Sequence, residues 1–271
     1  MYEKPSRAEW IDDPADPRLA PYLDIRERDL VGREGKFVAE GEVVLRCVVR
    51  EGGAVRLDSV LLADRRVAGL ADVIADLPAA TPVYVAPRAV LDAVAGFPLH
   101  RGILAIGARA PEPEPEALLR ALGPRAMVLA LFGISNHDNM GGVFRNAAAF
   151  GAGAVLLDPT CCDPLYRKAI RVSVGAALTV PFVRLPRDRD PLDLLTAHGF
   201  TALALSPSGG TRLSDLIRPE RAAVLLGSEG PGLPEAILKR ARAVSIPMAG
   251  RFDSLNVAVT AGVVLHQLAF S

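Results

Sequence analysis

The chain of 271 residues carries 31 basic and 31 acidic side chains, so its formal net charge is zero. Its composition, 50% hydrophobic and 23% charged, excludes a wholly disordered chain, and its length is typical of two domains. The even charge balance also argues against a protein that binds nucleic acid through bulk electrostatic attraction alone.

The cysteines, the histidines and the lengths of the apolar runs bear on the cellular compartment, on metal binding and on membrane association. The three cysteines, Cys47, Cys161 and Cys162, do not form a disulfide framework, and we interpret them as small apolar filler. The four histidines have no spacing typical of a metal site. The first residues lack a signal-peptide core, and no run approaches the ~20 apolar residues of a membrane span. We therefore expect a cytoplasmic protein with no metal and no membrane segment.

The N-terminal elements alternate between short apolar runs and helical patterns. Residues 36–49 place Val38, Val43, Val44 and Cys47 near one helical face. The pattern predicts strands at 59–63, 82–86 and 102–108, and helices at 67–77 and 88–97. This alternation predicts a compact α/β domain over residues 1–109, although the first ~30 residues give no clear pattern.

The segment 110–125 begins with the letters APEPEPEA, in which proline and glutamate alternate. Such a sequence favours a stiff, extended spacer that buries no apolar surface. We therefore predict a linker at 110–125 and a second domain at 126–271. The net charge is −3 up to residue 125 and +3 beyond it, so the slight basic excess lies in the second domain.

The second domain alternates more regularly. Strands are predicted at 126–134, 154–158, 178–183, 201–206, 222–228 and 244–248, and helices at 141–150, 165–174, 191–198, 234–242 and 254–270. Near-continuous apolar strands with helices between them predict a mostly parallel sheet that is covered on both faces. Ligands of such sheets bind beyond the carboxyl ends of the strands, here at the loops 135–142, 227–232 and 247–256.

The first loop leads into a predicted helix. A turn with a helix cap explains Asn139 and the glycines Gly141 and Gly142. It does not explain Arg145, because the predicted helix start places this cation near the positive end of the helix dipole. Arg145 is therefore a candidate functional residue.

The second loop has Gly227, Gly230 and Gly232 within six residues after a strand. It is neither a Walker loop nor a dinucleotide fingerprint, and Glu229 would repel a phosphate. A neutral or cationic ligand therefore fits better, and a plain glycine-rich turn is the alternative.

The third loop precedes a helix of small apolar residues, which is typical of burial or of packing on a partner helix. We expect Asp253 or Ser254 to cap this helix, with Asn256 early in it. Capping alone would explain Ser254 and Asn256.

Together the three loops resemble a known family. The series N-x-G-x-x-x-R-N-A-x-x-F-G at 139–151, LGSEGPGL at 226–233, IPM at 246–248 and SLNVAVTAGVVL at 254–265 is similar to the motifs of the SpoU/TrmH family. These are RNA ribose 2′-O-methyltransferases of the SPOUT superfamily. The resemblance implies S-adenosylmethionine as methyl donor, a trefoil knot in the C-terminal sheet and a homodimer through the C-terminal domain. The N-terminal part, with VAEGEVVL at 38–45, resembles the L30e-like substrate-binding domain often fused to these enzymes.

The resemblance also implies roles for individual residues. It implies catalytic roles for Asn139, Arg145, Glu229, Ser254 and Asn256, and cofactor binding by Gly227, Ile246, Leu255, Ser206 and Met248. Arg145 has two readings: it takes the proton of the 2′-hydroxyl, or it holds a phosphate and stabilises the developing alkoxide. Arginine's pKa, above ~12, favours the second reading.

The function implied is methylation of a ribose 2′-hydroxyl in rRNA or tRNA, and the fused N-terminal domain favours rRNA. A base-specific relative or a catalytically inactive knotted RNA-binding protein are the alternatives. The complete set of motif residues argues against loss of catalysis. A dehydrogenase on a dinucleotide-binding sheet is excluded because the glycine fingerprint is missing.

Overall fold

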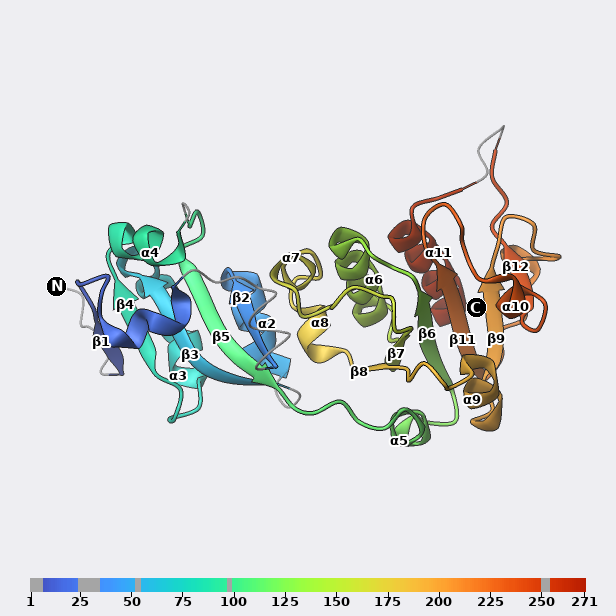
Figure 1. The fold of residues 1–271 in the computed structure, drawn as a ribbon, viewed down its shortest axis with the longest axis horizontal. Helices are drawn as coiled ribbons and strands as arrows, with labels where there is room; N and C mark the ends of the chain where they lie inside the picture. Colours follow the sequence, from blue (N-terminus) through green and yellow to red (C-terminus); the bar gives the residue numbers. More distant parts are fainter. Residues whose placement is uncertain (1–6, 24–34, 52–54, 97–98, 250–253) are drawn as a thin grey trace. The chain divides into compact units, whose positions relative to one another are not determined.

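The computed structural model describes residues 7–23, 35–51, 55–96, 99–249 and 254–271 (Figure 1). The chain divides into two compact units. The first contains Met1–Ala110 and Leu165–Thr179, and the second contains Pro111–Pro164 and Val180–Ser271. None of the helices within the described ranges is long and apolar enough to cross a membrane.

The first unit is a five-stranded sheet with helices. Its strands are β1 (Ala8–Trp10), β2 (Lys36–Glu40), β3 (Val55–Ala63), β4 (Val83–Ala86) and β5 (Ile103–Arg109). In the order β1-β4-β3-β5-β2, the first three are parallel and β5 runs antiparallel to both of its neighbours. The helices are α2 (Glu42–Glu51), α3 (Ala71–Asp76) and α4 (Arg88–Ala95), with 3-10 turns at Pro17–Tyr22, Asp64–Arg66 and Ala68–Leu70. The predicted α/β character and the three predicted strands are confirmed.

The helical interpretation of residues 36–49 is wrong for its first five residues. They form β2, and the helix starts only after Gly41. Gly41 has φ +95°, a conformation that favours glycine, and a Cβ there would lie 2.8 Å from Arg101 Cδ. The turn at Gly41 therefore separates Val38, on the strand, from Val43 and Cys47, on the helix.

Two short helices from the second half of the sequence complete the first unit. They are α7 (Arg167–Val172) and α8 (Ala176–Thr179). Arg167 Nη1 forms an ion pair with the buried carboxylate of Glu40 at 3.1 Å. The strand predicted at 178–183 is therefore wrong in its first part: the strand is β8 (Phe182–Arg184), and the Ala177 N–H donates to Ser173 Oγ at 3.1 Å to support the α8 turn.

The second unit is a seven-stranded sheet in the order β10-β12-β9-β11-β6-β7-β8, and every recorded strand pair is parallel. In chain order its remaining strands are β6 (Ala126–Phe132), β7 (Ala154–Leu157), β9 (Thr201–Leu205), β10 (Thr211–Arg212), β11 (Arg221–Gly227) and β12 (Arg242–Ser245). Its helices are α5 (Pro115–Ala121), α6 (His137–Ala149), α9 (Pro191–Ala197), α10 (Glu235–Leu238) and α11 (Val257–Phe270), with a 3-10 turn at Leu213–Asp215. The predicted mostly parallel α/β fold is confirmed, whereas the knot and the L30e likeness stay predictions.

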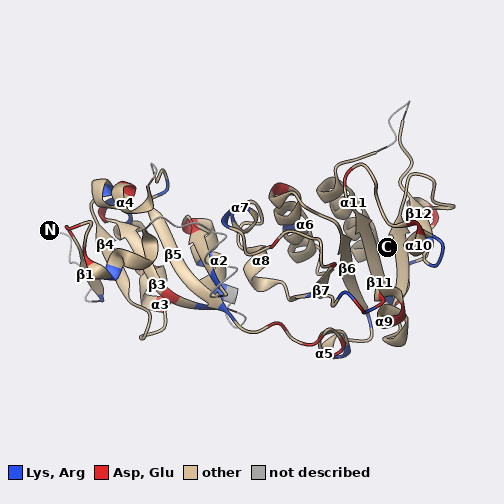
Figure 2. Cartoon of the chain, viewed as in Figure 1, with Lys and Arg blue, Asp and Glu red and all other residues tan. Residues whose placement is uncertain are grey.

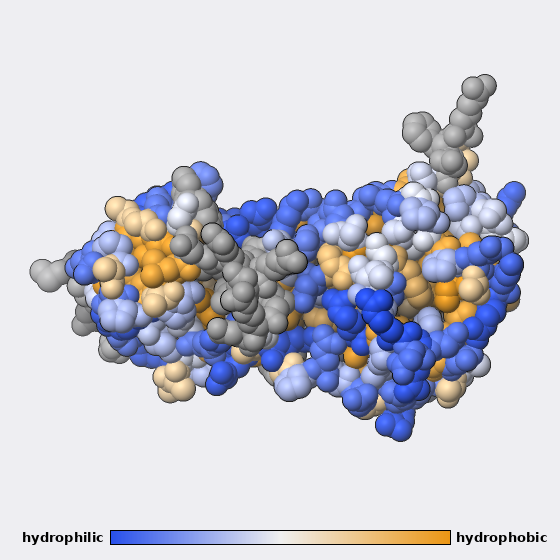
Figure 3. Space-filling model, in the orientation of Figure 1, coloured by the Kyte–Doolittle hydropathy of each residue, from blue (hydrophilic) through white to orange (hydrophobic). Residues whose placement is uncertain are grey.

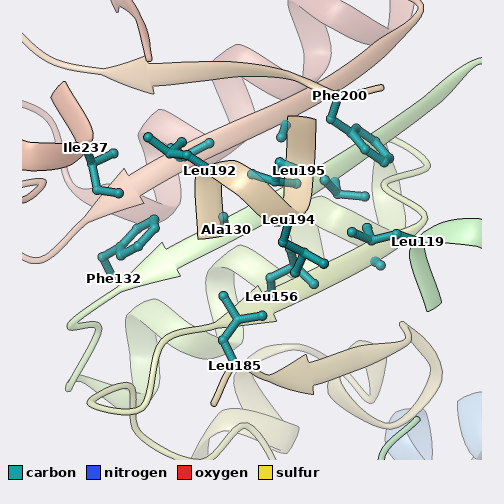
Figure 4. Packing of buried hydrophobic residues seen from close by; sticks show 14 of the residues in the cluster. Leu119, Ala130, Phe132, Leu156, Leu185, Leu192, Leu194, Leu195, Phe200 and Ile237 are labelled. Atoms are coloured by element: carbon teal, nitrogen blue, oxygen red, sulfur yellow. The ribbon is translucent and has the colours of Figure 1, made fainter. Parts of the chain in front are cut away.

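Helices cover both faces of this sheet. Alternate residues of β6, including Ala130 and Phe132, join α5, α9 and α10 in one buried cluster (Figure 4). On the other face, α6 and α11 contact each other, and they also contact β7 and β11 respectively. The carboxyl ends of the strands are left for loops.

The segment 110–125 contains a helix as well as an extended stretch. Residues 115–121 form α5, which begins at Pro115 because proline suits the first position of a helix. Leu119 of α5 is fully buried in the cluster of the second unit. The Arg221 guanidinium lies over the Phe200 ring and donates to the carbonyls of Leu119 and Leu122 at 2.9 and 3.0 Å. The predicted extended conformation therefore does not hold for residues 115–121.

This burial gives a stability prediction. Replacing Leu119 with alanine is expected to lower the free energy of unfolding by about 2–5 kcal/mol, because it removes a packed side chain and leaves a cavity. Chemical denaturation measures this, with Arg120→Ala, an exposed position on the same helix, as the control. Equal stability of both variants would show that α5 is only a spacer.

Charged residues of both signs occur along the chain in each unit (Figure 2). Basic and acidic residues are interspersed along the elements of each unit (Figure 2). On the face drawn in Figure 3, apolar surface occurs in patches between polar side chains. The interspersed charges drawn in Figure 2 agree with the net charge of zero.

Candidate active site

A pocket of about 370 Å³ lies in the second unit, where three segments leave the sheet beside the start of α11. Its walls come from the ends of β9 and β11, from the segment after β12 and from the start of α11. The volume is within the range of ~300–1,000 Å³ that small-molecule sites occupy. The pocket lies beyond the carboxyl ends of the strands, at the place predicted from the sequence, and its use as the functional site stays a prediction.

Most of the predicted site residues meet in this pocket. The five residues implied to bind cofactor all line it, namely Ser206, Gly227, Ile246, Met248 and Leu255. Glu229, Ser254 and Asn256 line it as well, whereas Asn139 and Arg145 do not. Sequence reasoning missed Leu205, Leu226 and Thr260 in the lining. The first two lie close to the ends of the predicted strands 201–206 and 222–228, so the rule that placed the site at strand ends was the signal that could have found them.

The glycine-rich loop turns back tightly onto the end of β11. A Cβ at Gly227 would collide with the backbone of Gly232 and Leu233, so this position has no room for a side chain. Gly230 and Gly232 have φ of +86° and +70°, and the Gly232 N–H donates to the Ser228 carbonyl at 3.0 Å. Backbone atoms of this loop therefore lie close to the pocket.

Three polar side chains from the three loops bond to one another. Asn139 Nδ2 donates to Glu229 Oε1 at 2.7 Å. Asn256 Nδ2 donates to Asn139 Oδ1 at 2.8 Å and to Glu229 Oε1 at 3.3 Å. One carboxylate oxygen therefore accepts bonds from two amides, which fixes its place in the pocket wall. Asn139 is buried and supports the wall from behind.

Asn256 has a second function in the same site. Its Oδ1 accepts the backbone N–H groups of Ala258 and Val259 at 2.9 and 3.3 Å, so Asn256 is the N-cap of α11. The expectation that Ser254 caps this helix is therefore wrong, and Asp253 lies outside the described residues. Because the oxygen is held by the helix, the amide nitrogen is directed toward Asn139 and Glu229.

The first loop also caps its helix one turn earlier than predicted. Asn136 accepts the N–H groups of Asp138 and Asn139 at 2.7 and 3.3 Å, and α6 begins at His137 instead of residue 141. Arg145 is consequently the ninth residue of α6, and the argument that placed it at the helix N-terminus does not hold. Its side chain is exposed, and no side chain of the described ranges pairs with its guanidinium.

Cys161 is buried and Cys162 is half-buried. Burial raises the pKa of Cys161 to about 12 and the pKa of Cys162 to about 11, so both thiols stay protonated at neutral pH. Within the part of the chain that the structure describes, no group of three or more His, Cys, Asp or Glu residues could hold a metal ion.

The sequence pattern and this geometry can be compared with known proteins. The model of the family described as "SpoU rRNA Methylase family" matches residues 126–266, which include all three loops. The chain belongs to the SpoU rRNA methylase family. The predicted RNA methyltransferase activity and the S-adenosylmethionine cofactor are thereby confirmed at the level of the family.

Similar proteins cover nearly the whole chain. An uncharacterized tRNA/rRNA methyltransferase of Mycobacterium tuberculosis is 39% identical over 266 residues, covering 94% of this chain and 89% of that protein. A crystal structure titled RNA 2′-O ribose methyltransferase aligns with a TM-score of 0.75 at 26% identity, covering 96% of this chain and 98% of the other. A rRNA methyltransferase from Sinorhizobium meliloti, solved with S-adenosylmethionine bound, aligns with a TM-score of 0.79 at 21% identity and 97% coverage of both chains, which supports the fold.

Proposed function

We propose that this SpoU-family chain transfers the methyl group of S-adenosylmethionine to a ribose 2′-hydroxyl of rRNA or tRNA. The observation that carries the proposal is the hydrogen-bonded cluster of Asn139, Glu229 and Asn256 at the strand-end pocket, with the exposed Arg145 on the same helix as Asn139. A cytoplasmic location belongs to the same proposal.

The residues around the pocket fit the cofactor. Gly227 and Gly232 bring backbone to the pocket wall, and a side chain at Gly227 would block this close approach. Ile246 and Met248 supply apolar wall, and the Glu229 carboxylate suits a ligand with positive charge. When bound, S-adenosylmethionine supplies a methyl group on a cationic sulfur.

The chain's own residues would then orient the acceptor. Asn139 and Asn256 hold Glu229 in one orientation, which preserves the shape and charge of the pocket wall. We assign to Arg145 the binding of an RNA phosphate and the stabilisation of negative charge that develops on the 2′-oxygen. Positioning of this kind lowers the barrier because the reacting atoms meet in line without further ordering.

A product analysis separates this proposal from its alternatives. The purified chain is incubated with tritiated S-adenosylmethionine and RNA from a strain that lacks the gene, and the RNA is digested to nucleosides. A 2′-O-methyl nucleoside supports the proposal, and a base-methylated nucleoside supports the base-specific alternative. If the chain binds RNA but transfers no label and binds no cofactor, it is an RNA-binding protein without catalysis.

We also propose a homodimer through the C-terminal domain. Val259, Val263 and Phe270 are exposed large apolar residues at helical spacing along α11. The His266 ring lies between Phe270 and Phe150 at centroid distances of 5.2 and 5.6 Å, so an aromatic cluster continues this face. An apolar stripe of this kind is typical of a surface that packs on a partner helix.

The proposed dimer is tested by introducing negative charge among the exposed apolar residues of α11. We expect the wild type to have twice the mass of one chain in light scattering after gel filtration, and Val259→Glu with Val263→Glu to have the mass of a single chain, because two buried carboxylates per chain would be unpaired. Val43→Glu, the same exchange at an exposed valine of the first unit, is the control. A wild type with the mass of one chain would contradict the proposal.

A further inference from the structure

Asn146 follows Arg145 on α6 and reaches the first turn of α11. Its Nδ2 donates to the Ala258 carbonyl at 2.6 Å. The same side chain lies against Gly262, where an added Cβ would be only 3.2 Å from Nδ2 and 3.3 Å from Cγ. These distances are shorter than ordinary van der Waals contacts. The missing side chain at Gly262 therefore leaves a space, here called the Gly262 notch, that the Asn146 side chain occupies.

A second notch faces the other way. A Cβ at Gly142 of α6 would lie 2.7 Å from Ala258 Cβ, so the alanine methyl group occupies the space that this glycine leaves. Ala258 thus meets α6 twice: its methyl group enters the Gly142 notch and its carbonyl binds Asn146. A slide of either helix by one residue, about 1.5 Å, would disrupt both contacts.

The hydrogen bond of Asn146 and a second one described above, here called the two anchors, both join α6 to α11 or its N-cap. The second, from Asn256 to Asn139, lies seven residues earlier on α6, which is two turns or about 10 Å along the helix. One anchor alone would allow the helices to pivot about it, whereas two anchors fix their direction. Arg145 lies between the anchors in sequence and is exposed.

We propose that Asn146 is a positioning residue that acts on methyl transfer through Arg145. By holding α6 on α11, it sets where the Arg145 guanidinium stands relative to the loop that carries Ser254 and Asn256. Asn146 does not line the pocket, so we expect its substitution to remove no direct contact with the cofactor. This role rests on the function proposed above.

The test uses a substitution that keeps the shape of the side chain. Asn146→Asp replaces the donating amide with a carboxylate oxygen that faces the Ala258 carbonyl. We expect the single-turnover rate of methylation to fall by about tenfold or more, since a small displacement of a catalytic group has large effects on rate. The Kd for S-adenosylmethionine, measured by calorimetry, is expected to stay within about twofold of wild type, which is a negligible free-energy change.

Two further variants keep the test specific. Asn136→Asp makes the same chemical exchange on the same helix, where a carboxylate still caps, and is expected to behave as wild type. Gly262→Ala fills the notch from the side of α11 and is expected to reproduce the slow rate with unchanged cofactor affinity. A wild-type rate in Asn146→Asp, or equal losses of rate and of cofactor affinity, would overturn the inference.

Hydrogen exchange provides a readout that needs no substrate. If Asn146 holds the helices together, backbone amides 257–263 are expected to exchange faster in Asn146→Asp than in Asn136→Asp. Equal hydrogen-exchange rates of amides 257–263 in the two variants would overturn the inference, even if the wild type methylated RNA normally. Conversely, a wild type that methylates no RNA would refute the proposed function, and the exchange result would still decide whether Asn146 anchors α11.

Discussion

Arg145→Ala is expected to lower the rate of RNA methylation by at least about 100-fold, the scale on which removal of a charge-stabilising group acts. The Arg145 side chain is exposed, does not line the pocket and has no ion-pair partner among the described residues, so its removal leaves the pocket wall intact. The Kd for S-adenosylmethionine and the melting temperature are therefore expected to match the wild type. Single-turnover methylation and calorimetry measure the two effects separately, and near-normal turnover would contradict the assignment.

Arg145→Lys then distinguishes the two readings of this residue. If the cation stabilises a phosphate and an alkoxide, lysine retains part of the rate, and that rate falls as pH rises toward the lysine pKa of ~10.4, because the positive charge is lost. If the residue takes the proton, the rate of the lysine variant rises over the same range, since the neutral amine is the active form. The slope of the pH–rate profile therefore decides between them.

Gly227→Ala is expected to remove cofactor binding. The new Cβ would collide with backbone atoms of Gly232 and Leu233, which cannot rotate away as a side chain could. The loop after β11 must therefore move, and it forms one wall of the pocket. We expect the Kd for S-adenosylmethionine to rise by at least about 100-fold, which corresponds to the loss of about 2.7 kcal/mol of binding free energy.

A matched exchange separates this effect from a general loss of glycine. Gly210→Ala changes a glycine of the same unit whose added Cβ would meet open space, and it is expected to bind cofactor as the wild type does. Circular dichroism confirms that both variants are folded. Wild-type affinity in folded Gly227→Ala would show that the loop is not part of the cofactor site.

The sheet of the second unit could be predicted because its strands are short, continuous apolar runs between turn residues. Such runs are buried on both faces, and the strand beginning at residue 126 was placed at its first residue. Helix starts were harder to predict. Asn136 and Asn139 are both good capping residues, and only the backbone bonds accepted by Asn136 show which of them begins α6.

Other features depend on contacts that the local sequence does not contain. The helix α5 forms in a proline-rich segment because Leu118 and Leu119 find a buried cluster built by strands far along the chain. The Glu40–Arg167 ion pair joins residues 127 positions apart, so the place of α7 and α8 in the first unit had no local signal. The motif resemblance predicts Glu229 and Asn256 as site residues. The hydrogen bonds that both of them make with Asn139 are seen only in the structure.

The central claim is that the chain methylates a ribose 2′-hydroxyl, and mapping of ribose methylation in total RNA tests it most directly. RNA from the wild type is compared with RNA from a strain that lacks the gene and from that strain supplied with either the wild-type or the Arg145→Ala gene. We predict that a 2′-O-methyl nucleotide of rRNA or tRNA is absent without the gene, returns with the wild-type copy and does not return with Arg145→Ala. An unchanged set of 2′-O-methyl nucleotides in the strain that lacks the gene would contradict the claim.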